Sequence, residues 1–191
     1  MSRHMDELCL GAKIALRSYF LQKYHSEGKI WVMDCFAGPE GTWNRLKEMF
    51  DIDRYWGIDL KSKPGRLMLD SARILKKAGW TENVVDLDAY GSPWKHWRNM
   101  LRTAKGPKTV FLTVGVMKKA GGGSNYEKEV KAPLGIPEDW TLPASLGSSL
   151  AAMSVSYAIH QATDLGWWIR DVKEAWPQAG ARYLGVRIEP Q

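Results

Sequence analysis

Short apolar runs that end at or near an aspartate recur through the first half of the sequence, and helix-forming stretches lie between them. The runs at 30–36 (IWVMDCF), 55–60 (YWGIDL) and 83–88 (NVVDLD) are rich in β-branched and aromatic residues and too short for core helices, which is typical of buried strands. Strands that alternate with helices form α/β domains with a mainly parallel sheet. The pattern therefore predicts that fold class for this chain.

The remainder of the chain continues the alternation. We expect further strands at 66–69, 108–115 and 181–188, and helices at 8–24, 42–50, 72–78, 94–104, 144–163 and 167–176. The expected fold is a Rossmann-like, mainly parallel sheet with helices on both faces. The 191 residues would form a single domain with an N-terminal helix at 1–29, a ligand-binding core at 30–115, a loop insertion at 116–143, and C-terminal helices and a strand at 144–191.

Composition narrows the class of protein. Hydrophobic residues make up 45% of the chain, too many for intrinsic disorder, and no apolar run is long enough to predict a membrane span. The two cysteines, Cys9 and Cys35, and the four histidines lack metal-ligand spacing, so we expect no metal and a reducing, cytoplasmic setting. A net charge of +6 and ten tryptophans suit a polyanionic partner.

Acidic residues follow four neighbouring strands of the predicted sheet. Asp34 follows the first strand, Asp59 the second and Asp70 the third, and Asp86 and Asp88 lie at the end of the fourth. In open parallel sheets the ligand binds beyond the carboxyl ends of the strands, at the point where the strand order reverses. We therefore expect these carboxylates to surround one ligand site.

The loop after the first strand indicates which ligand this site prefers. Its sequence is DCFAGPEG at 34–41, which is neither GxGxxG nor a P-loop. Pro39 removes a donor N–H, and Asp34 and Glu40 place negative charge where a pyrophosphate would lie. The loop therefore favours a neutral or cationic ligand.

S-adenosylmethionine has the chemistry that such a site can bind. Asp34 would face its amino group, the backbone at Gly38 and Gly41 would approach it closely, and Asp59 would accept both ribose hydroxyls. Asp70 and Ser71 would meet the adenine amino group. The predicted cofactor-binding residues are Asp34, Ala37, Gly38, Pro39, Gly41, Asp59, Leu60, Asp70, Ser71 and Asp86.

These features resemble a class I S-adenosylmethionine-dependent methyltransferase over roughly residues 30–115. The run DLDAYGSP at 86–93 resembles the D-L-D-P-F-G-S-P motif of the tRNA guanine-N2 methyltransferase family, and departs from it at Ala89 and Tyr90. The resemblance does not extend to that family's long C-terminal tRNA-binding part, so a tRNA substrate does not follow from it. The resemblance implies that Asp88 and Tyr90 are catalytic and that substrate binds at Gly91, Ser92, Pro93 and Trp94.

The chemistry of an exocyclic amine explains why such a motif is needed. The lone pair of the amine is delocalised into the base, so acceptor oxygens must align and polarise its N–H groups. Tyr90 would stack on the base. The sequence therefore predicts a methyltransferase that modifies an exocyclic base nitrogen of a nucleic acid, RNA in preference to duplex DNA.

Several of these residues also have a structural interpretation, which the sequence leaves open. Asp70 fits the N-cap of the helix that begins at Ser71, and one of Asp86 and Asp88 fits a structural role. Tyr90 and Trp94 could instead cover the sheet.

Two other functions compete with the predicted one. The run AGPEGTW at 37–43 resembles the A-P-G-G-W loop of ribosomal-RNA 2′-O-methyltransferases, whose Lys-Asp-Lys-Glu tetrad deprotonates a ribose. Glu189 would then be the tetrad glutamate, and Lys13 or Lys118 a tetrad lysine. The third reading is a non-catalytic module on the same fold that binds nucleic acid or a protein partner.

Overall fold

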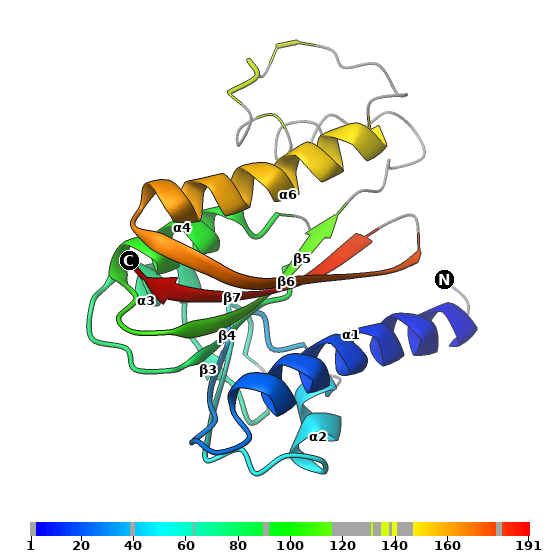
Figure 1. The fold of residues 1–191 in the computed structure, drawn as a ribbon. Coiled ribbons are helices and arrows are strands. Elements are labelled where there is room, and N and C mark those ends of the chain that lie inside the picture. The colour runs from blue at the N-terminus through cyan, green and yellow to red at the C-terminus, as the bar shows by residue number, and fades with distance from the viewer. Residues whose placement is uncertain are drawn as a thin grey trace.

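The computed structural model describes residues 3–38, 41–62, 64–89, 92–115, 131, 135–137, 139–140, 147–178 and 181–191, in which strands alternate with helices (Figure 1). The strands are β1 (Trp31–Asp34), β2 (Arg54–Asp59), β3 (Leu67–Met68), β4 (Val84–Leu87), β5 (Lys108–Gly115), β6 (Trp167–Gln178) and β7 (Ala181–Pro190). The helices are α1 (Arg3–Tyr24), α2 (Thr42–Lys47), α3 (Ser71–Lys76), α4 (Trp94–Thr103) and α6 (Gly147–Asp164).

The described strands form one seven-stranded sheet in the order β3-β2-β1-β4-β5-β7-β6. Neighbours from β3 to β5 are parallel, whereas β7 runs antiparallel to both β5 and β6. The chain moves outward from β1 to β3 and then crosses back to β4, so the strand order reverses between β1 and β4. The mainly parallel sheet is confirmed, and its reversal point is where ligands bind in such folds.

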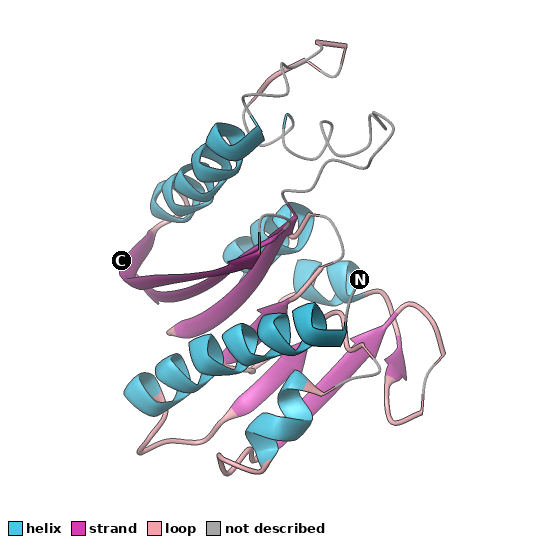
Figure 2. Cartoon of the chain, turned by 90° about the vertical axis from the view of Figure 1, so that its right-hand side faces the viewer, coloured by secondary structure: helices cyan, strands magenta, loops and turns pink. Residues whose placement is uncertain are grey.

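Helices cover both faces of the sheet, as predicted (Figures 1 and 2). On one face α1 and α2 pack on β1 and β5 through a buried cluster that includes Phe20, Val32 and Phe111. On the other face α3, α4 and α6 enclose a larger cluster that includes Met33, Trp97 and Leu184. Alternation along β1 explains this division, because successive side chains of a strand point to opposite faces.

A close fit between Phe20 and Gly185 fixes α1 on the sheet. Phe20 is fully buried and lies edge-on to Phe111 of β5. A Cβ atom at Gly185 of β7 would lie 2.3 Å from the Phe20 ring, so only glycine leaves space for that ring. This contact sets where the polar residues of α1 meet the strand ends.

The helix expected at 167–176 is wrong, because this segment forms strand β6. β6 pairs with β7 along most of its length, so 144–191 contains one helix and two strands rather than helices and a strand. Trp167 is buried and Trp168 is exposed, which is the alternation of a strand with one covered face. Pairing with β7, which follows within three residues of its end, outweighs the helical spacing of the apolar residues.

The other expected elements exist, with small shifts at their ends. β5 has the predicted bounds, and β3 shortens to two residues. Most of the loop expected at 116–143 lies outside the described residues. Within the described part of the chain, no helix is long and apolar enough to cross a bilayer, and no three His, Cys, Asp or Glu residues are arranged to hold a metal ion.

Candidate functional site

Acidic residues gather at the carboxyl edge of the parallel strands. Asp34 ends β1, and its register partner on β4 is Asp86, so both side chains point to the face covered by α1 and α2. Asp88 follows β4, and Asp59 ends β2 on the other side of β1. Asp70 follows β3 at the same edge. The sheet thus brings together the strand-end carboxylates that the sequence predicted.

Asp34 is buried beside a second carboxylate. Its Oδ2 accepts a hydrogen bond from the Tyr55 hydroxyl at 2.8 Å, and its Oδ1 accepts one from the Phe36 backbone N–H at 3.2 Å. Burial and the nearby charge of Asp86 raise the pKa of Asp34 to about 7, despite these two donors. Asp34 therefore changes protonation state close to neutral pH, and a cationic ligand would favour its ionised form.

The raised pKa of Asp34 predicts a stability change with pH. In the folded state Asp34 holds a proton that the unfolded chain has released, so the free energy of unfolding falls as pH rises from about 4 to about 7. Between pH 5 and pH 7 the loss should be about 1–2 kcal/mol. Asp34→Asn should remove this contribution, as measured by urea unfolding across that range.

Two histidines, His25 buried and His96 half-buried, change the free energy of unfolding with pH in the opposite direction, so they define the control. Burial lowers the pKa of both His25 and His96 to about 4, so their contribution to stability grows as pH rises from about 4 to 6.5. The quantity to measure is therefore the difference in the free energy of unfolding between wild type and Asp34→Asn. A difference that stays constant from pH 5 to pH 7 would contradict the raised pKa.

Asp86 is held in a buried ion pair with α1. Arg17 donates from Nε to Asp86 Oδ2 and from a terminal nitrogen to Oδ1, both at 2.8 Å, and the side chains of both residues are 2% exposed. The Trp43 indole of α2 donates to the same Oδ2 at 2.7 Å. Three donors therefore satisfy this carboxylate from within the protein, which fits the structural role that the sequence left open for one of Asp86 and Asp88.

Asp88 is more accessible and remains ionised. Lys13 Nζ lies 2.5 Å from its Oδ2, Thr113 of β5 donates to its Oδ1 at 2.5 Å, and its side chain is 21% exposed. Burial alone would raise the pKa of Asp88, but Arg17 and Lys13 with these hydrogen bonds lower it below 3.8. Asp88 is thus an oriented carboxylate that carries its charge at neutral pH.

Sequence reasoning missed most of the partners of these carboxylates. Arg17, Trp43, Tyr55 and Thr113 were not singled out, and Lys13 was named only as a tetrad candidate. The available signal was the spacing of Lys13 and Arg17, four residues apart and hence on one face of α1. A pair of cations on the sheet-facing side of a helix requires buried carboxylates opposite.

The loop between β1 and α2 leaves backbone open to a ligand. The Ala37 N–H donates to Ile58 of β2 at 3.0 Å, and a Cβ built at Gly38 would meet nothing within 4 Å. At Gly41 a Cβ would lie 2.1 Å from Asn44, so glycine is required there for the close start of α2. Pro39 and Glu40 lie outside the described residues.

At β2 and β3 the predicted residues have different surroundings. Asp59 is half-buried and accepts the Lys61 N–H at 2.8 Å, and Leu60 is 72% exposed. Asp70 caps α3 by accepting the Ala72 N–H at 2.9 Å, which is the structural alternative that the sequence left open. Ser71 is buried and donates to the Cys35 carbonyl.

The turn that leads into α4 is described only in part. Tyr90 and Gly91 lie outside the described residues. The Ser92 hydroxyl is 3.4 Å from the Trp94 backbone N–H, which donates to it. Pro93 is buried, and Trp94 is 4% exposed within the core cluster on the α4 face. The indole of Trp94 therefore packs against the sheet, which was the alternative to a substrate contact.

The position of Glu189 corrects the tetrad interpretation. β7 is antiparallel to β5, and Lys108 at the start of β5 pairs with Ile188, so Glu189 lies at the opposite edge of the sheet from Asp88. Its carboxylate accepts a hydrogen bond from Arg170 at 2.8 Å. Glu189 therefore cannot join Lys13 and Asp88 in one site. Lys118 lies outside the described residues.

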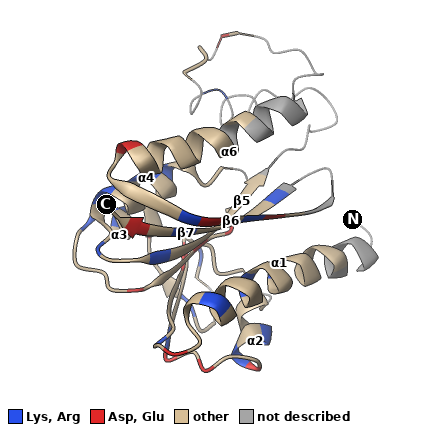
Figure 3. Ribbon diagram, viewed as in Figure 1, with Lys and Arg blue, Asp and Glu red and all other residues tan. Residues whose placement is uncertain are grey.

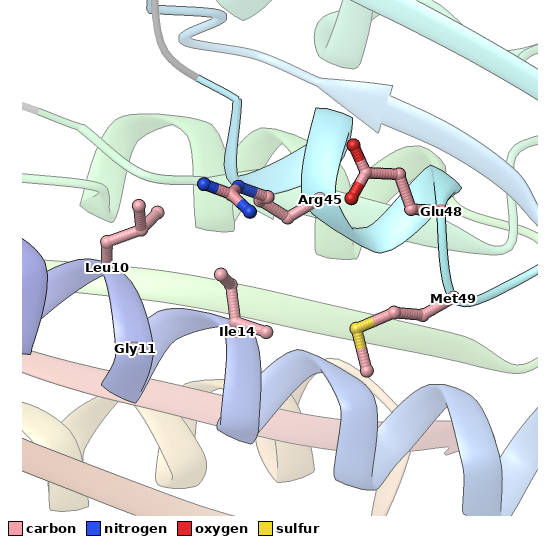
Figure 4. Close-up of a pocket in the computed structure, with 6 residues that line it drawn as sticks. All are labelled: Leu10, Gly11, Ile14, Arg45, Glu48 and Met49. Atoms are coloured by element: carbon pink, nitrogen blue, oxygen red, sulfur yellow. The ribbon is translucent and has the colours of Figure 1, made fainter.

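A shallow pocket of about 350 Å³ lies between α1 and α2, away from these carboxylates (Figure 4). Leu10, Gly11, Ile14 and Met49 supply most of its lining, with Arg45 and Glu48 at the α2 side. None of the strand-end aspartates lines it, so the chemistry of the site does not extend into this pocket.

Solved structures of several proteins resemble this chain. Trm1 from Pyrococcus horikoshii, solved with S-adenosyl-L-methionine, matches with a TM-score of 0.66 at 15% identity over 96% of this chain, which spans 55% of the Trm1 chain. TYW2 from M. jannaschii, solved with AdoMet, matches with a TM-score of 0.53 at 11% identity over 85% of this chain and 70% of TYW2. The plantazolicin methyltransferase BamL, solved with SAH, matches with a TM-score of 0.56 at 10% identity over 96% of this chain and 85% of BamL.

No family model matches the sequence, and no curated protein matches it significantly. At identities of 10–15% the structural matches show a shared fold. The sheet order, with β7 antiparallel to its neighbours, and the helices on both faces agree with that likeness. The chain therefore has the Rossmann-like class I fold of S-adenosylmethionine-dependent methyltransferases.

Proposed function

We propose that this protein is an S-adenosylmethionine-dependent methyltransferase that modifies an exocyclic base nitrogen of a nucleic acid, RNA in preference to duplex DNA. The main support is Asp88, an oriented and ionised carboxylate at the carboxyl end of β4. It directly precedes the segment 89–93, and the run DLDAYGSP resembles the motif of the guanine-N2 family. Trm1, TYW2 and BamL are each solved with the cofactor or SAH.

The described residues fit this cofactor. The open backbone at Gly38 leaves space for a ligand beside β1, and Asp34 can offer a carboxylate to its ammonium group. Asp59 ends β2 and would accept the ribose hydroxyls. When bound, the cofactor supplies an electrophilic methyl group on a sulfonium. Pro39, Leu60 and Asp70 stay predicted contacts, and the three donors that hold Asp86 support a positioning role for it instead.

The residues of the chain would act on the acceptor amine. Asp88 would accept an N–H of the amine and turn its lone pair toward the methyl group, because the lowered pKa of Asp88 keeps it an acceptor. When the nitrogen takes up the methyl group, the carbon–sulfur bond would break and leave its electron pair on sulfur. The Asp88 carboxylate would stabilise the positive charge on nitrogen, and the proton would leave to Asp88 or water. Lys13 and Thr113 would hold the carboxylate in place, and Tyr90 would stack on the base.

Asp59→Ala should weaken cofactor binding. Loss of the acceptor for two ribose hydroxyls should cost more than about 1 kcal/mol, which is at least fivefold in Kd, by calorimetry with S-adenosylmethionine or its demethylated product. Asp51→Ala, an exposed position before β2, is the matched control and should bind like wild type. Absence of binding by wild type would reject the proposed function and leave the non-catalytic module.

Ribose 2′-O-methylation is the second candidate, and one contact favours it. Lys13 Nζ lies 2.5 Å from the Asp88 carboxylate. This contact joins a lysine and an aspartate, which are two of the residue types in the Lys-Asp-Lys-Glu tetrad. The position of Glu189 at the opposite edge of the sheet counts against it. Labelled methyl transfer to total RNA, nuclease digestion and mass spectrometry separate the candidates. A labelled methyl group on an exocyclic base nitrogen supports the proposed function. A labelled methyl group on ribose supports the second candidate instead.

A further inference from the structure

Seven exposed cations gather on α3, α4 and the residues that directly follow these helices. We define this α3–α4 basic surface by Arg73, Lys76, Lys77, Lys95, Arg98, Arg102 and Lys105. Figure 3 colours the lysines and arginines of the described residues blue. Between positions 71 and 108 the acidic residues are Glu82, Asp86 and Asp88, of which the first two are 1% exposed and the third is paired with Lys13. Asp70, 3.5 Å from Arg73, is the acidic neighbour at its edge. The surface therefore carries a strong positive charge.

The cations of α4 form a continuous stripe. Lys95, Arg98 and Arg102 are spaced by three and four residues, so they lie on one side of the helix. Trp97 and Met100 on the other side are fully buried against the sheet. At 1.5 Å rise per residue the stripe runs for roughly 10 Å from Lys95 to Arg102. It begins beside the turn that follows Asp88.

The helix dipole offsets only part of the repulsion along α4. Like charges three and four residues apart repel and Lys95 in the first turn opposes the dipole, whereas Arg102 in the last turn of α4 and Arg73 and Lys76 in the last turn of α3 favour it. α3 and α4 contain no acidic residue that could form a compensating pair. Elsewhere the same chain pairs its surface cations, as in Lys23 with Asp171 and Arg170 with Glu189. The α3–α4 basic surface is therefore better suited to binding an external anion than to stabilising the fold.

We propose that the α3–α4 basic surface binds the phosphodiester backbone of a nucleic-acid strand. A row of cations on a helix matches the repeated charge of a backbone, and binding would release the counterions of the neutralised phosphates. Because α4 begins at Trp94, six residues after Asp88 at the end of β4, a strand bound there runs toward the site at β4. This last step rests on the proposed function, whereas binding to the surface does not require catalysis.

Charge reversal on α4 tests the surface. Arg98→Glu/Arg102→Glu should weaken binding of a fluorescein-labelled single-stranded RNA at least tenfold in fluorescence anisotropy. The slope of log K against log salt is negative, and it should become less steep by about 1.4, because each lost phosphate contact on a single strand contributes about 0.7 to its magnitude. Lys29→Glu/Arg54→Glu at the amino edge of the sheet is the matched control, with the same change in net charge, and should weaken binding less than threefold.

The outcomes separate the surface from the catalytic proposal. Equal weakening by the two double variants, or no weakening by Arg98→Glu/Arg102→Glu, would overturn the surface. Absence of RNA binding by wild type would also overturn the proposed surface. The same holds if Arg98→Glu/Arg102→Glu loses binding to phosphatidylserine vesicles but keeps its binding to RNA. Calorimetry with S-adenosylmethionine should give the wild-type Kd for both variants, so a failure of cofactor binding in wild type counts against the proposed function only.

Discussion

Replacing Asp88 with asparagine should lower methyl-transfer turnover by about 100-fold or more while leaving the affinity for S-adenosylmethionine within about twofold of wild type. Asp88 is assigned to the acceptor side of the reaction, and an amide that has lost the negative charge cannot stabilise positive charge on the attacking nitrogen. Single-turnover rates with labelled cofactor measure the loss. The partial exposure of Asp88 predicts only a small change in the melting temperature.

Two further variants show whether Asp88 acts as an ionised acceptor. Lys13→Met removes one of the two cations that lower the pKa of Asp88, the other being Arg17, so the acid limb of the pH–rate profile should move to higher pH. Thr113→Val removes one hydrogen bond to the same carboxylate and should cause a smaller loss of turnover than Asp88→Asn. If Lys13→Met abolishes activity at every pH, the lysine is itself the base, and ribose methylation becomes the better explanation. Wild-type turnover in Asp88→Asn would reject its assigned role.

Arg17→Ala should be the most destabilising single substitution among those considered. It leaves the Asp86 carboxylate buried without its charge partner, and removal of one partner from a buried ion pair costs about 3–5 kcal/mol. For a domain of this size the melting temperature should fall by roughly 6–20 °C. Arg17 also lies over the Phe111 ring, with 5.0 Å between the guanidinium carbon and the ring centroid, so packing is lost as well.

A double variant separates the cost of the orphaned charge from the loss of α1 packing. Arg17→Met/Asp86→Leu removes both charges and should recover at least half of the lost stability, because buried pairs replaced by apolar residues are often close to neutral. The same variant also tests the role of Asp86. Cofactor affinity near that of wild type would establish a structural role, whereas a loss of tenfold or more would restore Asp86 as a cofactor contact. A cost below about 1 kcal/mol for Arg17→Ala would contradict the buried pair.

The elements that depend on local pattern were predictable from the sequence. β5 has its predicted bounds, and Asp34 and Asp59 end their strands as expected. These features follow from the length of an apolar run, from β-branched residues and from the turn that comes after each run, all of which act within a few residues. The segment of β6 has the spacing of a helix, and it is a strand because it pairs with β7, which the spacing of its own apolar residues does not encode.

Local residue patterns are sufficient to predict that carboxylates follow successive parallel strands beside a glycine loop, and hence where a ligand site lies. The role of each carboxylate depends on how α1 packs over the strand ends. The ion pairs of Arg17 with Asp86 and of Lys13 with Asp88 join residues 69 and 75 positions apart. They exist because Phe20 fits against Gly185 and fixes α1 over the strand ends. Such contacts depend on how two elements pack against each other, which no local pattern of residues specifies. The direction of β7 is also set by its pairing with other strands, and because β7 is antiparallel to β5, Glu189 lies away from the site.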